Sequence, residues 1–109
     1  MATTTIPTTV APKAAARVVE LGFQADLERM LEHTRLTVPG LRAIDVTLED
    51  DPCPGEDPGV VIWSHREDPG PGDDPTDRQW GEWEAQTFPP EVSQHFCMLS
   101  TYGAAAHGR

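Results

Sequence analysis

The side chains of His65, His95 and Cys97 are the candidates for a metal or hydrolytic site in this chain. His95 and Cys97 flank a single residue, so in an extended strand both side chains point to the same face. A neighbouring strand carrying His65 would add a third ligand. These side chains could then bind zinc or, with a nearby carboxylate, assist hydrolysis. The pattern makes a small metal-dependent or histidine-assisted hydrolase one function to consider.

The spacing of these residues argues against that function. The four histidines and two cysteines form neither a C-x-x-C nor an H-x-x-x-H pair, which are spacings typical of zinc sites. A lone cysteine in an apolar strand is usually a small buried hydrophobe. No serine stands in a G-x-S-x-G motif, and no glycine-rich loop is followed by a lysine that could bind phosphate. We therefore predict no catalytic residue, no metal ligand and no cofactor, and the hydrolase is kept as the alternative.

The strongest pattern in the sequence is the position of its charge. Eleven carboxylates and a single arginine, Arg66, lie between Asp45 and Asp77, and this stretch carries the entire formal net charge of −10. The seven acidic residues elsewhere are balanced by seven basic ones. Phosphate backbones are bound by basic residues, so this charge argues against nucleic acid as a partner and favours a basic protein.

The acidic residues gather in two loops rich in proline and glycine, at residues 49–59 and 67–74. The loops flank one predicted strand and should lie about 20 Å apart, at its two ends. Neither has the ligand spacing of an EF-hand, so we expect no specific calcium site. Turn formation and solubility are the simpler explanation of such loops. If the loops bind a basic partner, the contacting residues are Asp50, Asp51, Glu56, Asp57, Glu67, Asp68, Asp73 and Asp74.

Two helices are expected to support these loops. Apolar residues at steps of three and four predict an amphipathic helix from Pro12 to about Leu36, with a kink or a break near Gly22. A second helix is predicted at 75–86, where Asp74 and Pro75 form a good start.

Three strands are expected beside the helices. Alternating apolar residues predict a strand at 41–48. A β-branched and aromatic run predicts a second strand at 60–65, with Val60 to Trp63 buried on both faces. The apolar segment 96–102 predicts the third.

These elements predict one α+β domain over residues 12–103, in the order α-β-β-α-β, with two main helices and a small three-stranded, mostly antiparallel sheet. Residues 1–11 and 104–109 are predicted to be flexible tails. The sequence has no secretory signal and no apolar stretch of about 20 residues. We therefore expect a cytoplasmic protein with free thiols and no membrane contact.

The predicted function is that of an acidic, non-catalytic interaction protein, which binds a basic protein partner as an inhibitor, an antitoxin-like neutraliser or an adaptor. Trp63, Trp80, Trp83 and Tyr102 are the aromatic residues available to anchor a contact, although tryptophan in a small domain more often packs in the core. The free edge of the sheet offers a second mode of association, a homodimer. Binding through exposed carboxylates should weaken with salt, because charges are screened beyond about 8 Å at physiological ionic strength.

Overall fold

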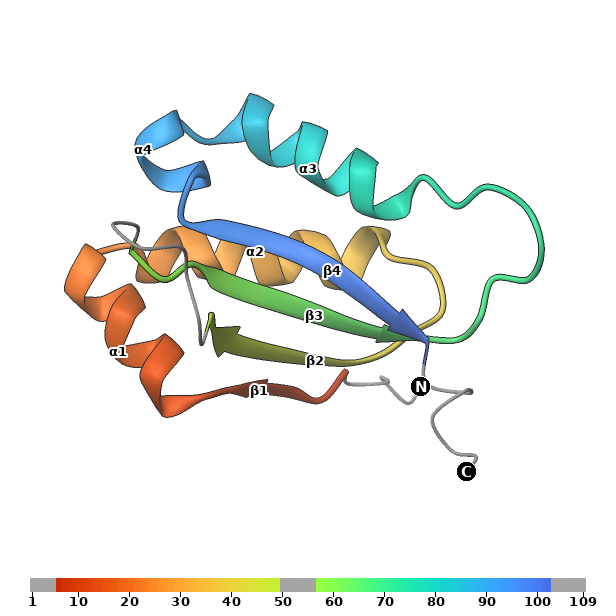
Figure 1. The fold of residues 1–109 in the computed structure, drawn as a ribbon, viewed down its shortest axis with the longest axis horizontal. Coiled ribbons are helices and arrows are strands. Elements are labelled where there is room, and N and C mark those ends of the chain that lie inside the picture. The colour runs from red at the N-terminus through yellow and green to blue at the C-terminus, as the bar shows by residue number, and fades with distance from the viewer. Residues whose placement is uncertain (1–5, 50–56, 103–109) are drawn as a thin grey trace, which may run out of the picture.

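A computed structural model describes residues 6–49 and 57–102, and within these ranges the chain has the predicted α+β architecture (Figure 1). Three predicted contact residues, Asp50, Asp51 and Glu56, lie outside the described residues. The elements follow in the order β1 (Thr8–Val10), α1 (Pro12–Leu21), α2 (Gln24–Thr37), β2 (Leu41–Leu48), β3 (Val60–Arg66), α3 (Thr76–Thr87), α4 (Pro90–Ser93) and β4 (Phe96–Tyr102).

The sheet has four strands in the order β1-β2-β3-β4, so the prediction of three strands is wrong. Of the three described strand pairs, β2 and β3 are antiparallel, whereas β1 runs parallel to β2 and β4 runs parallel to β3. The sheet is therefore mixed and not mostly antiparallel. The parallel β4 arises because α3 and α4 carry the chain back along the sheet before β4 begins (Figure 1).

The missed strand is β1, which occupies part of the segment predicted to be a flexible tail. Backbone hydrogen bonds hold this segment against β2: Ile44 N–H donates to Pro7 O at 2.9 Å, and Ala11 N–H donates to Val46 O at 2.8 Å. A strand of three residues is too short to show an apolar alternation. β1 is ordered because it pairs with β2, a strand that lies much further along the chain.

The described helices pack against one face of the sheet. In Figure 1, α2 passes behind β3 and β4, while α1 and α3 lie to either side. The core between helices and sheet includes Val18, Leu27, Met30, Leu31, Ile44, Val46, Val60, Ile62, Trp80, Phe96 and Met98. Val61 and Trp63 alternate with the buried residues of β3 and are only half-buried, so the prediction that this strand is buried on both faces is wrong.

The break near Gly22 is confirmed. Gly22 has a φ of 78°, in the left-handed region, and its N–H donates to the carbonyl oxygens of Val18 and Val19 at 3.0 and 3.1 Å. These bonds satisfy the carbonyl groups at the end of α1, and α2 then starts in a new direction. None of the helices within residues 6–49 and 57–102 is long and apolar enough to cross a membrane.

Candidate functional site

The face of the sheet opposite the helices, here called the open face, lies between the two acidic loops. Its side chains are those of Asp45, Thr47, Val61, Trp63, His65, Cys97, Leu99 and Thr101. Leu99 is 42% exposed, and most of the others are half-buried. Trp63 Nε1–H donates to Thr47 Oγ1 at 3.0 Å, which holds the indole ring along the sheet. The face therefore combines an apolar centre with polar side chains that are already hydrogen-bonded.

Three polar side chains form a chain across three strands of this face. His65 Nε2 lies 2.7 Å from Asp45 Oδ2, and His65 Nδ1 lies 2.6 Å from Thr101 Oγ1. With neutral His65, the carboxylate accepts the Nε2 proton, and Nδ1 then accepts a hydrogen bond from the threonine hydroxyl. This is a carboxylate–imidazole–hydroxyl arrangement, which can orient a proton acceptor toward an alcohol.

No sequence pattern pointed directly to this arrangement. Asp45 is one of many acidic residues in the sequence, and Thr101 belongs to an apolar run. Their meeting depends on the register, in which His65 lies opposite Thr101 and diagonal to Asp45, since Asp45 is paired with Trp63. A parallel β4, which the sequence analysis did not anticipate, is needed to produce this register.

The first acidic loop is described only at its two ends. Asp57 is exposed, and its Oδ2 lies 3.4 Å from a guanidinium nitrogen of Arg17 on α1. Glu49 Oε1 accepts the N–H of Gly59 at 3.2 Å, which helps to close the base of the loop. Glu49 and Asp57, the described carboxylates at the ends of this loop, therefore already make contacts within the chain.

In the second loop Glu67, Asp68 and Asp73 are exposed, whereas Asp74 is held inside a network. Asp68 Oδ1 accepts the N–H of Gly70 at 2.9 Å. Asp74 accepts hydrogen bonds from the Thr76 hydroxyl at 2.6 Å and from a guanidinium nitrogen of Arg66 at 2.8 Å. These bonds, that of Thr76 above all, lower the pKa of Asp74 to about 2. Asp74 is therefore engaged by its own chain rather than presented to a partner.

Arg66 explains why part of the acidic stretch is structural. Its side chain is 1% exposed, and Nε donates to Pro39 O at 3.1 Å. The same guanidinium nitrogen that contacts Asp74 donates to Ser100 Oγ at 3.2 Å, and Asp77 accepts the N–H of Ser100 at 3.1 Å. The one basic residue of the acidic stretch, placed at the end of an apolar strand, was the sequence signal for this buried network.

The described ends of the first loop and the second loop lie at opposite ends of β3, as predicted (Figure 1). Asp57 and Glu49 mark the end at which β3 begins, and the exposed carboxylates of Glu67, Asp68 and Asp73 follow its other end. The open face of β3 spans the distance between them. Trp63 therefore lies on a strand whose two ends are both followed or preceded by exposed carboxylates.

His65, His95 and Cys97 are not brought together. The carbonyl of His95 accepts the N–H of Val60 at the start of β3, and its ring lies 5.8 Å from that of Phe23, whereas His65 is near the end of the strand. Partial burial of the thiol, together with the carboxylates of Glu84 and Glu49, raises the pKa of Cys97, which makes it a poor nucleophile. In residues 6–49 and 57–102 no three histidine, cysteine or acidic side chains are grouped so as to hold a metal ion.

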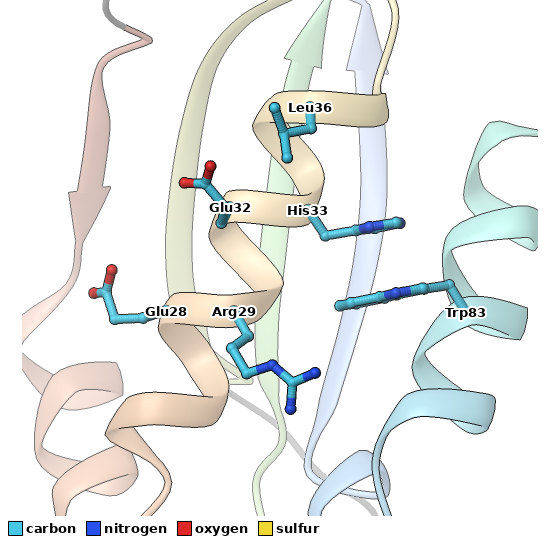
Figure 2. A pocket seen from close by; sticks show the side chains of 6 residues that line it. All are labelled: Glu28, Arg29, Glu32, His33, Leu36 and Trp83. Atoms are coloured by element: carbon cyan, nitrogen blue, oxygen red, sulfur yellow. The ribbon is translucent and has the colours of Figure 1, made fainter.

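A separate groove lies between α2 and α3 (Figure 2). His33 stacks on Trp83 with ring centroids 3.7 Å apart and planes 2° from parallel, and burial lowers the pKa of His33. Arg29 places its guanidinium 5.0 Å from the ring centre of Phe88. Glu28 extends away from the ring pair in Figure 2. The two rings stack on each other, which indicates a packing role for this groove. Core packing was one of the two roles expected for Trp83 from the sequence.

Compared with known proteins, the chain matches no family model, no curated protein and no solved structure.

Proposed function

We propose that this chain is a non-catalytic interaction protein that binds a basic protein partner through its acidic loops and the open face between them. The roles that fit this proposal are those of an inhibitor, an antitoxin-like neutraliser or an adaptor in the cytoplasm. The observation that carries it is the position of Trp63, half-buried on an open face that is flanked by exposed carboxylates at both ends of β3.

The general energetics of protein interfaces support separate roles for the apolar open face and for the acidic loops. Binding energy usually comes from a few aromatic or arginine anchors in a desolvated centre, while charges at the rim steer the partner and set specificity. Trp63, Val61 and Leu99 supply the centre, and Asp57, together with the acidic loop after β3, supplies the rim.

Charge also favours a basic partner over a second copy of the chain at the open face. Both ends of the open face are acidic, so two copies meeting through this face would bring like charges together in either orientation. A homodimer would have to use another surface, such as the outer edge of β1. A basic partner meets the open face without this repulsion.

The proposal is tested by neutralising the exposed carboxylates of the second loop. The immobilised variant Glu67→Gln, Asp68→Asn, Asp73→Asn should retain a basic partner from a cell lysate much less than the wild type does. Each neutralised rim charge is expected to weaken binding about two- to fivefold at low salt, mainly through slower association. The affinity of the recovered partner is then measured at low and high salt for each variant.

A matched control carries the same change of charge on the helical side. Glu28→Gln, Glu82→Gln, Glu91→Gln removes three exposed carboxylates of α2, α3 and α4 and should leave partner binding as in the wild type. Trp63→Ala should weaken binding at every salt concentration, because its contribution is apolar. Equal binding by both triple variants, or binding that does not respond to salt, would refute the proposed contact.

The second candidate is the histidine-assisted hydrolase, favoured by the chain of Asp45, His65 and Thr101. In such an enzyme Thr101 Oγ would attack an acyl carbon while its proton passes to His65. The leaving alcohol would take that proton from His65, and water would then release the acyl group from Thr101. Hydrolysis of nitrophenyl acetate by the wild type, abolished in His65→Gln and in Thr101→Val, would support this candidate. Hydrolysis that persists in both variants would exclude it.

A further inference from the structure

A cavity of about 610 Å³ lies where β1 leaves the sheet, and its lining residues are Ala11, Pro12, Lys13, Thr47, Leu48 and Trp63. β1 pairs with β2 only as far as Val10, opposite Val46, after which the chain turns into α1. The last residues of β2 therefore have no outer neighbour among the described strands, and the cavity occupies this gap. Its volume falls within the range of about 300–1,000 Å³ that is usual for small-molecule sites.

The walls of the cavity suit a flat apolar group. Trp63 reaches the cavity from β3 and is held in place by its hydrogen bond to Thr47 at 3.0 Å. Leu48, Ala11 and Pro12 complete an apolar lining beside the indole ring. An aromatic ring system could lie against Trp63 without displacing any hydrogen bond of the sheet.

Three groups at the cavity can donate hydrogen bonds. Thr47 Oγ1 accepts the indole N–H, so its own hydroxyl hydrogen is free to donate. Successive backbone N–H groups of β2 point alternately toward β1 and toward β3. Ile44 N–H faces β1, where it donates to Pro7 O. By the same alternation Leu48 N–H, together with the carbonyl oxygen of Leu48, faces this edge beyond the end of β1. Ala11 O, the next acceptor along the series, is used instead by Ala15 N–H at 2.9 Å.

The third donor is the ammonium group of Lys13, the only lysine in a chain of net charge −10. Among the described residues no acidic side chain lines the cavity. Three donors, one of them positively charged, are complementary to a carboxylate, and this charge is opposite in sign to that of the loops of the proposed partner contact.

We propose that this cavity binds a small organic carboxylate with a flat apolar body. The carboxylate is placed near Lys13, Thr47 and the Leu48 N–H, and the apolar body lies against Trp63. The inference rests on the cavity alone and holds whether or not the acidic loops bind a protein partner.

The test is a titration of the full chain with naphthoate, followed through the indole N–H resonance of Trp63 in heteronuclear NMR spectra. This resonance is identified as the signal that disappears in Trp63→Phe. Naphthoate should shift it saturably, and naphthamide, which is neutral and of similar shape, should bind about tenfold more weakly. Lys13→Gln should weaken naphthoate binding about tenfold and leave naphthamide binding unchanged.

Arg78→Gln is the matched control, because it removes one positive charge from an exposed position of α3 outside the cavity. This variant should bind naphthoate as the wild type does. The proposal is overturned if naphthoate causes no saturable shift, if the amide binds as tightly as the acid, or if Lys13→Gln and Arg78→Gln have equal affinities. The resonances of Trp80 and Trp83, which do not line this cavity, report whether each variant remains folded.

Discussion

At the scale of single residues, Glu84 on α3 is a carboxyl group enclosed by the fold. Its side chain is buried, and Oε2 has no hydrogen-bond partner among the described residues. Burial raises the pKa of Glu84 from 4.5 to about 7. Between these two values the folded state keeps a proton that the unfolded state has released. The contribution of Glu84 to stability therefore falls as the pH rises from about 4.5 to 7 and stays low above that range.

Glu84→Gln should accordingly stabilise the protein at pH values above 7. We expect the free energy of unfolding to rise by about 1 to 2 kcal/mol in alkaline buffer, because a buried charge is removed, and to change little near the ordinary pKa of glutamate. Urea denaturation at the two pH values measures both quantities. The exposed neighbour Glu82→Gln is the control, and a gain of the same size at both pH values would contradict the pKa assigned to Glu84.

For the pair of Arg66 and Asp74 we predict the opposite dependence of stability on pH. Because the pKa of Asp74 is lowered from 3.8 to about 2, its contribution to stability is present above pH 3.8 and is lost as the pH falls through 2. Asp74→Asn should lower the urea midpoint at neutral pH, since it leaves the charge of Arg66 buried. Asp73→Asn, at the exposed neighbouring position, should not, and the difference between the two variants should shrink as the pH falls toward 2 and disappear below it.

At the scale of elements, two glycines in helical segments have opposite roles. Gly22 ends α1 with a φ of 78°, which residues with a Cβ rarely adopt, so Gly22→Ala should destabilise the protein by about 1 kcal/mol. Gly81 lies inside α3, where an added Cβ would meet no atom within 4 Å. Gly81→Ala should therefore stabilise the protein by about 0.5 to 1 kcal/mol. Thermal unfolding of both variants checks the two signs, and a shift in the same direction for both would contradict the helix boundary.

At the scale of the whole molecule, the acidic surface should repel itself. The net charge is −10, and exposed carboxylates gather around the ends of β3. Added sodium chloride screens this repulsion, so the melting temperature of the free protein should rise with salt while partner binding weakens. The loop variant Glu67→Gln, Asp68→Asn, Asp73→Asn should show a smaller rise than the helix variant Glu28→Gln, Glu82→Gln, Glu91→Gln. Equal salt responses would mean that the clustering of charge has no effect.

Patterns in the sequence were enough to predict the three longer helices, the three longer strands and the position of the charge. Local signals were sufficient for these features: Gly22 marks a helix end, Pro39 and Gly40 separate α2 from β2, and proline and glycine delimit the two acidic loops. The α+β class followed from the order of the elements. These properties depend on residues that are neighbours in the chain, so their patterns can be recognised without a structure.

The neighbours of each strand, and the contacts that acidic residues make within the chain, could be seen only in the folded structure. β1 is ordered by β2, Asp45 meets Thr101 through His65, and Asp74 neutralises Arg66, although each contact joins separate segments of the chain. Such contacts depend on strand order and register, for which the local sequence carries little information. The cavity beside Lys13 has the same origin, because it exists only where β1 stops pairing with β2 and the chain turns into α1.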